Sequence, residues 1–205
     1  MLDTLPEVTG AGGRTDPRVL RSRRAVLDAA LHELAGNGYG AFTIESVAAR
    51  CGVARSTIYR LWPDKLQLIS DAVETLNEQP RPDGRPDESA RDHVAALVRH
   101  LAEVMAESMV SACLPALIDG AERDEAVRSL HHAYNERRRA SLVAAISAAI
   151  ESGEVSHDVD PELAALALAG AIVYRRLMTS EPFNPWETNR LLDAVIGPRP
   201  TAMRP

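Results

Sequence analysis

The stretch from Phe42 to Lys65, FTIESVAARCGVARSTIYRLWPDK, decides the fold of this 205-residue chain. Its apolar residues recur at intervals of three and four, which predicts helices rather than strands. Thr43 can cap a helix over residues 44–51, and Gly52 supplies the permissive backbone for a sharp turn directly after it. A further helix is predicted from about Ala54 to Trp62, and the proline that follows should end it. The stretch therefore predicts two short helices joined by a tight turn.

The second of these helices has a polar, basic outer face. Its inward side is predicted to comprise Ile58, Leu61 and Trp62, and its outward side Arg55, Ser56, Tyr59 and Arg60. From Ser46 to Arg60 every charged residue is an arginine, so no carboxylate within this window would repel a phosphate. Two short helices with a basic second one are the geometry that enters the major groove of DNA. Periodicity alone leaves open a plain three-helix hairpin with a solvated, arginine-bearing face.

Charge is distributed unevenly along the chain. Between Arg14 and Lys65 there are nine basic and five acidic residues, a net charge of +4, whereas the rest of the chain carries -10, which gives the total of -6. A basic head on an acidic body suits a protein that touches DNA at one end only.

The same stretch resembles the signature of the tetracycline-repressor (TetR) family. The shared elements are a Thr-Ile start, an Ala-x-x-x-Gly-Val turn beginning at Ala48, and a Tyr-x-x-Trp-x-x-Lys ending formed by Tyr59, Trp62 and Lys65. The match spans roughly residues 20 to 70, about a quarter of the chain. It implies a DNA-binding transcriptional regulator with a helix-turn-helix head and a helical body that binds an effector and dimerises.

The resemblance also implies roles for individual residues of the head. Thr43, Tyr59, Arg60 and Lys65 would bind backbone phosphates of a double-stranded DNA operator, although Thr43 can equally be a plain N-cap. Base reading would fall to Arg55, Ser56 and Thr57, because the N-terminal part of a recognition helix reaches the groove floor. Trp62 would pack the helices together.

Helical periodicity extends along nearly the whole chain and predicts an all-α protein of about nine helices. A first helix from Pro17 should end at Gly36, Asn37 and Gly38. Later helices are predicted near 64–76, 87–109, 111–119, 123–151, 161–179 and 185–196, with breaks at Gly120, Gly153, Pro161 and Pro182. The expected organisation is a flexible tail at 1–16, the DNA-binding domain at 17–79, a linker at 80–86, the effector-binding and dimerisation domain at 87–197, and a flexible tail at 198–205.

The predicted helix over 161–179 carries small residues on one side. In the family, the last two long helices of each subunit form a four-helix bundle with those of a partner, and here they would be 123–151 and 161–179. The expected homodimer interface comprises Ala167, Gly170, Ala171 and Tyr174. A helix buried within a monomer is the alternative.

The body is also expected to hold a small, largely apolar effector that releases the operator. The candidate cavity residues are Met105, Met109, Cys113, Leu117, Tyr134, Val173 and Phe183. Any one of them taken singly fits a plain core position better, so the cavity is a prediction about the group. A solid core would instead indicate a DNA-binding factor without an effector. Pro115 either breaks its helix and lets the segment move, or ends one helix and begins another.

Other classes of protein find little support in the sequence. His131 and His132 are adjacent and therefore point to different faces of a helix, and no catalytic triad, phosphate-binding glycine loop or paired-carboxylate setting stands out, so an enzyme on a helical scaffold is the least favoured alternative. No cofactor and no metal are expected. Cys51 and Cys113 are interpreted as free, small hydrophobic residues. The longest apolar run, Leu163 to Tyr174, is too short to span a membrane, so we expect a cytoplasmic protein with no membrane partner.

Overall fold

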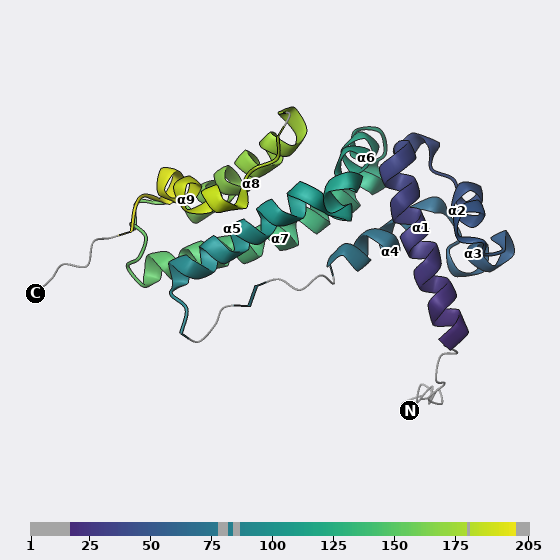
Figure 1. Cartoon of the computed structure of the whole chain (residues 1–205), viewed down its shortest axis with the longest axis horizontal. Helices are drawn as coiled ribbons and strands as arrows, with labels where there is room; N and C mark the ends of the chain where they lie inside the picture. The colour runs from purple at the N-terminus through teal and green to yellow at the C-terminus, as the bar shows by residue number, and fades with distance from the viewer. Residues whose placement is uncertain (1–16, 78–81, 84–86, 180, 200–205) are drawn as a thin grey trace, which may run out of the picture.

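The computed structural model describes residues 17–77, 82–83, 87–179 and 181–199 (Figure 1). Within them lie α1 (Pro17–Ala41), α2 (Ile44–Cys51), α3 (Arg55–Leu61), α4 (Lys65–Asn77), α5 (Ala90–Glu107), α6 (Met109–Arg123), α7 (Glu125–Glu151), α8 (Pro161–Met178), the 3-10 turn η1 (Pro185–Glu187) and α9 (Thr188–Ile196). The all-α prediction is confirmed. The predicted tail at 1–16, most of the predicted linker at 80–86 and residues 200–205 lie outside the described residues.

The helices form a small head and a longer body (Figure 1). Helices α2 and α3 lie at one end, beside α1 and α4, and α8 and α9 lie toward the other end. Helices α5 and α7 run side by side through the body, and α6 packs on α1. Among the described residues no single helix could span a membrane; α5 and α6 would meet the requirement only as a pair, and they are bent by 78° where they meet.

The core of the head is built around α3 and the turn before it. Phe42, Ile58 and Trp62 are almost completely buried, and the indole nitrogen of Trp62 donates to Asp71 of α4 at 3.0 Å. Arg23 of α1 donates to the same carboxylate at 2.7 Å. Trp62 therefore packs as predicted. The inward placement of Leu61 is wrong, because this residue is 38% exposed. Leu61 is the last residue of α3, and the adjacent Trp62 enters the core in its place.

The predicted end of the first helix coincides with a real kink. Gly38 has φ 76° and ψ 170°, a non-helical conformation in the left-handed half of φ space that favours glycine. Helical structure then resumes for one short turn up to Ala41. The kink places Tyr39 in the core, where it is 6% exposed.

The predicted break at Gly120 is wrong, because α6 runs through Gly120 to Arg123. A side chain at this position would place its Cβ 2.9 Å from Cγ of Tyr39 and 3.0 Å from Cγ1 of Val127. Gly120 is therefore needed for the close approach of α1 and α7 to α6, and not for a turn. The break between α6 and α7 lies instead at Asp124. The break between α5 and α6, predicted near residue 110, lies at Ser108, whose hydroxyl accepts from the Ser111 N–H at 3.4 Å.

Both interpretations of Pro115 are wrong, because Pro115 lies inside the continuous helix α6. Proline has no N–H, so the carbonyl of Ser111 lacks its usual helical partner. Arg176 of α8 takes that place: its Nη2 donates to the Ser111 carbonyl at 3.3 Å and its Nε to the Ser111 hydroxyl at 2.5 Å. The hydroxyl in turn donates to the Met105 carbonyl at 2.7 Å. We call Met105, Ser111 and Arg176 together the Ser111 clasp. It joins the end of α5, the start of α6 and the end of α8.

Candidate functional site

The helix-turn-helix is built from local signals. The Thr43 hydroxyl oxygen accepts from the Ser46 N–H at 3.1 Å and so caps α2. Gly52 has φ 69° and its N–H bonds to the Ala48 carbonyl at 2.9 Å, which ends α2 and turns the chain into α3. The predicted cap and turn are confirmed.

The outer face of α3 is basic and accessible. Arg55, Ser56, Tyr59 and Arg60 are exposed, Thr57 is half-buried, and Ile58 anchors the opposite side of the helix in the core. Within the part of the chain that the structure describes, neither Arg55 nor Arg60 belongs to an ion pair. Their guanidinium groups are therefore available to an anionic partner.

Arg50, the third arginine of this segment, has a structural contact instead. Its Nε donates to Oε2 of Glu33 at 3.0 Å, and Asn37 donates to the other oxygen of that carboxylate at 2.5 Å. Burial raises the pKa of Glu33, but the hydrogen bonds from Arg50, Asn37 and Ser46 outweigh it, so the pKa lies below its usual value. The charged Glu33 thus fastens α2 to α1.

A carboxylate does lie on the α3 face, contrary to what the charge pattern suggested. The Tyr59 hydroxyl donates to Oε1 of Glu45 at 3.0 Å. Glu45 precedes the all-arginine window by one residue, and the fold brings the first turn of α2 against α3. Counting charges along the chain missed this contact because it depends on how two helices pack.

Lys65 lies where the head meets the body. Its ammonium group is 4.1 Å from the centre of the Tyr39 ring, and the Tyr39 hydroxyl donates to Asp124 at 2.6 Å. Asp124 also caps α7 by accepting from the Ala126 N–H at 2.9 Å. Burial and the neighbouring Asp124 raise the pKa of Tyr39 to about 12. The first residue of α4 is therefore held against the joint between α1, α6 and α7.

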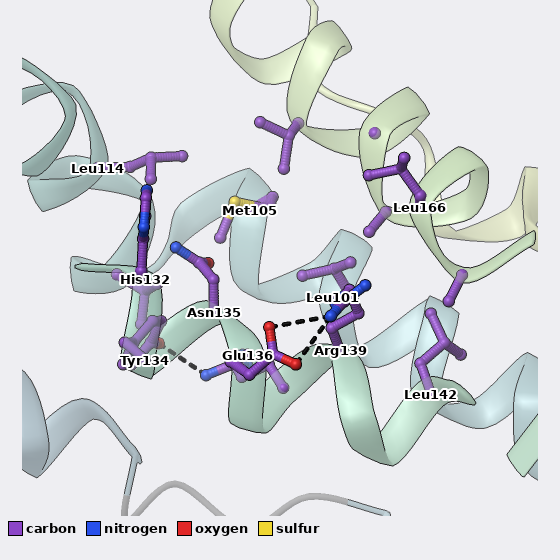
Figure 2. Close-up of a pocket in the computed structure, with 16 residues that line it drawn as sticks. Leu101, Met105, Leu114, His132, Tyr134, Asn135, Glu136, Arg139, Leu142 and Leu166 are labelled. Atoms are coloured by element: carbon purple, nitrogen blue, oxygen red, sulfur yellow. Dashed lines mark hydrogen bonds and ion pairs between the residues drawn. The ribbon is translucent and has the colours of Figure 1, made fainter. Parts of the chain in front are cut away.

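The body contains a half-open cavity of about 480 Å³ between α5, α6, α7 and α8 (Figure 2). The walls from α5, α6 and α8 are apolar: Leu101, Met105, Val110, Leu114, Ala165, Leu166, Ala169, Gly170 and Val173. Helix α7 supplies the polar wall together with Leu142: His132, Tyr134, Asn135, Glu136, Arg138 and Arg139. In Figure 2, Met105 and Leu166 lie on opposite sides of the cavity. The size and lining suit a small ligand with an apolar body and a polar end.

Ion pairs fix the polar wall in place. Arg139 donates to both oxygens of Glu136 at 2.8 and 2.9 Å (Figure 2). It also donates to Glu162 of α8 at 2.6 Å. Arg138 donates to the Tyr134 hydroxyl at 2.7 Å. Arg139 thereby connects α7 to α8 beside the cavity.

Helix α8 presents an apolar face to solvent. The large exposed residues are Leu163 at 64%, Leu166 at 61%, Tyr174 at 63% and Met178 at 69%. Ala167 and Gly170 are exposed between them, Ala171 is half-buried, and a side chain added at Gly170 would meet nothing within 4 Å. Surface of this kind marks an interaction site on a soluble domain.

Comparison with known proteins places both halves of the chain in one group. Residues 26–72 match the model described as "Bacterial regulatory proteins, tetR family", and residues 85–195 match "Tetracyclin repressor-like, C-terminal domain". The chain belongs to the TetR family. It is a helix-turn-helix transcriptional regulator of that family.

Relatives of this TetR-family regulator resemble it along most of their length. The HTH-type transcriptional regulator YdeS of Bacillus subtilis is 28% identical over 83% of this chain and 86% of its own. The DNA-binding transcriptional repressor TetR of Mycobacteroides abscessus is also 28% identical, over 84% of this chain and 90% of its own. The crystal structure of AibR in complex with isovaleryl coenzyme A and operator DNA shares the fold, with a TM-score of 0.67 and 18% identity over 86% of this chain and 99% of that one.

In this TetR-family chain, the seven residues expected around an effector do not gather in one place. Met105, Tyr134 and Val173 line the cavity. Cys113, Leu117 and Phe183 are buried in the core without lining it, and Met109 lies at a separate surface groove between α1 and α4. The Cys113 sulfur lies 3.5 Å from the Leu31 carbonyl of α1, and burial raises the pKa of its thiol to about 11. Cys113 thus packs toward the head and not toward the cavity.

The sequence of this TetR-family chain does not show that several of the residues that line the cavity lie there. Asn135, Glu136 and Arg139 read as an ordinary solvated helix face, because the cavity exists only where α8 packs near α7, as in the long-range pair of Arg139 with Glu162. The four-residue spacings of Leu101 with Met105 and of Val110 with Leu114 would have been a usable signal for shared faces.

Proposed function

We propose that the chain is a dimeric repressor that binds a palindromic operator through α3 and is released by a small, largely apolar effector bound in the body cavity. Two features found together in one chain carry the proposal. One is an accessible α3 whose Arg55 and Arg60 have no ion-pair partner among the described residues, and the other is a body cavity that is apolar on its α5, α6 and α8 walls. The Mycobacteroides relative, named as a repressor, and AibR, described with operator DNA and an acyl coenzyme A, support it.

On the DNA side, Arg55 is the principal base reader, with Ser56 and Thr57 beside it at the start of α3. An arginine can donate two parallel hydrogen bonds to guanine in the major groove. Backbone phosphates are bound by Thr43, Tyr59, Arg60 and Lys65. Lys65 also lies on the Tyr39 ring, which places this phosphate contact beside the joint between head and body.

Dimerisation uses the exposed face of α8. Leu163, Leu166, Tyr174 and Met178 would bury their side chains against a second copy, and Ala167, Gly170 and Ala171 let its backbone approach. A two-fold dimer presents two α3 helices to successive major grooves, which explains why we expect a palindromic site.

The effector acts through α6. Met105, Val110 and Val173 line the cavity next to the Ser111 clasp, and α6 contacts α1 through Gly120 and Tyr39. A ligand that favours a different position of α6 changes the spacing of the two heads, and weakens DNA binding by its differential affinity for the two arrangements. A coupling of about 1 to 3 kcal/mol gives a 5- to 150-fold change in affinity.

The proposal is tested by measuring fluorescence anisotropy of a labelled duplex, obtained by selection with the purified protein, in the presence of apolar compounds that raise its melting temperature. At least one stabilising compound should weaken DNA binding, and a cavity-filling Ala169→Phe variant should bind DNA while losing that response. If compounds bind the cavity tightly and never alter DNA affinity, the release mechanism is contradicted and the protein is a DNA-binding factor without an effector.

A further inference from the structure

The contact between Glu45 and Tyr59 lies on the surface that the proposed function assigns to DNA. Both side chains are exposed, and they meet at 3.0 Å with the phenol hydroxyl as donor. The backbone N–H of its own residue, the Tyr59 hydroxyl and the positive charge of Arg55 keep the pKa of Glu45 below its usual value. Glu45 is therefore a carboxylate at neutral pH, next to the first arginine of α3.

A carboxylate and a phosphodiester offer the same chemistry to a phenol. Each presents an anionic oxygen that accepts a hydrogen bond, and a tyrosine hydroxyl has one hydrogen to donate. Tyr59 can therefore donate to Glu45 or to a DNA phosphate, but not to both. A phosphate that approaches Tyr59 also approaches the negative charge of Glu45, and is repelled by it.

Folding stability alone does not explain the contact between Glu45 and Tyr59. A hydrogen bond between two solvent-exposed side chains contributes little to folding stability. The helix start is already capped by Thr43, whose hydroxyl bonds to Ser46. The position of Glu45 matters more for what approaches α3 than for the fold of α2.

We propose that Glu45 takes the place of a DNA phosphate in the free protein, holding Tyr59 and lowering the affinity of the head for DNA of any sequence. The inference rests on the proposed function, since Tyr59 is one of its phosphate contacts. Binding DNA then exchanges the Tyr59–Glu45 bond for a Tyr59–phosphate bond. The Tyr59–Glu45 bond must break for this exchange, and that costs free energy. The contacts that Arg55 and the remaining phosphate-binding residues make with DNA must outweigh this cost.

The test is a double-mutant cycle with Glu45→Gln and Tyr59→Phe, measured on the selected duplex and on a random-sequence duplex of equal length. Glu45→Gln keeps the shape of the side chain and removes its charge. It should tighten binding to both duplexes about tenfold, because it removes the repulsion and leaves only a neutral amide oxygen, a weaker acceptor, to hold the Tyr59 hydroxyl. In the Tyr59→Phe background, where only the repulsion is removed, the gain should fall to about threefold. The slope of log affinity against log salt should steepen by up to about one unit.

Glu103→Gln is the matched control, because Glu103 is an exposed carboxylate on α5 whose loss changes the net charge by the same amount. It should leave DNA affinity within about twofold of the wild type. Melting curves recorded for each variant confirm that binding is measured on folded protein.

The outcomes separate this inference from the proposed function. A wild-type protein that binds neither duplex contradicts the proposed function and this inference together. A wild-type protein that binds DNA, with no gain or a loss in Glu45→Gln, contradicts the inference alone. Equal gains in the wild-type and Tyr59→Phe backgrounds would reduce Glu45 to a plain repulsive charge and overturn its role as a stand-in for phosphate.

Discussion

Replacing Arg176 by methionine removes both donors that serve Ser111 while keeping a long, largely apolar side chain. Ser111 is 2% exposed, and its carbonyl has no helical partner because residue 115 is proline. A buried carbonyl left without a donor costs about 1 to 3 kcal/mol. The hydroxyl of Ser111 still donates to Met105, so its loss is smaller. We expect Arg176→Met to lower the free energy of unfolding by about 2 kcal/mol.

Pro115→Ala provides the decisive comparison, because alanine restores a backbone N–H facing the Ser111 carbonyl. In the wild type that carbonyl already has a donor, whereas in Arg176→Met it has none. Pro115→Ala should therefore stabilise Arg176→Met by about 1 kcal/mol more than it stabilises the wild type. The better helix propensity of alanine is common to both backgrounds and cancels in the cycle.

The assay is urea unfolding followed by far-UV circular dichroism at one protomer concentration, since the stability of the proposed dimer would depend on concentration. Arg190→Met is the control, because this exposed arginine pairs with Glu187 alone among the described residues, and it should change stability by less than about 0.5 kcal/mol. Additive effects of Arg176→Met and Pro115→Ala, within about 0.3 to 0.5 kcal/mol, would refute the role of Arg176 as the replacement donor.

Four further predictions concern the joint, the DNA contacts and the dimer. Gly120→Val should destabilise the fold by about 1 to 3 kcal/mol in urea unfolding, because its side chain would overlap Tyr39, whereas Gly36→Ala, with open space around it, should not destabilise it. The hydrogen bond from Tyr39 is the main cause that lowers the pKa of Asp124, so the stabilisation that this bond contributes is present at neutral pH and is lost as the pH falls below the usual aspartate value of 3.8. The loss of melting temperature caused by Tyr39→Phe should therefore be smaller at pH 3 than at pH 7. A loss that is the same at both pH values would contradict this reasoning. Lys65→Ala should weaken binding to all DNA sequences and reduce the salt slope by about one unit, and sequence-selective weakening would show that Lys65 does more than bind phosphate. Tyr174→Glu should convert the dimer to monomers in sedimentation velocity, and a variant that stays dimeric at micromolar concentration would exclude this face of α8 as the interface.

The features that the sequence predicted well depend on neighbours along the chain. Thr43 sets the start of α2 through its hydroxyl, which accepts from the N–H three residues on, and Gly52 sets the end through its N–H, which bonds to the carbonyl four residues back. Both signals are local in the sequence. Trp62 could be placed in the core because helical periodicity and its size agree.

The features that were missed depend on contacts between distant segments. The sequence predicts a helix break at Gly120 because nothing near it in the chain shows that Tyr39 packs on its backbone. It predicts a break at Pro115 because the donor that compensates for the proline, Arg176, comes from α8. The charge pattern of α3 omits Glu45 for the same reason, since this residue comes from α2. The polar wall of the cavity could not be distinguished from a solvated surface without knowing where α8 lies.

The most direct test of the account is to sequence DNA selected from a random pool by the wild-type protein and, in parallel, by Arg55→Ala. We predict that the wild type enriches a palindrome whose half-sites are about one helical turn or slightly more apart, roughly 34 to 36 Å in the simple two-fold case. Arg55→Ala should select a site of the same symmetry with relaxed preference at one base pair in each half, and should bind the wild-type site about 1 to 3 kcal/mol more weakly. No enriched sequence, a site without two-fold symmetry, or identical preferences in the two selections would contradict a dimer that reads its operator through α3.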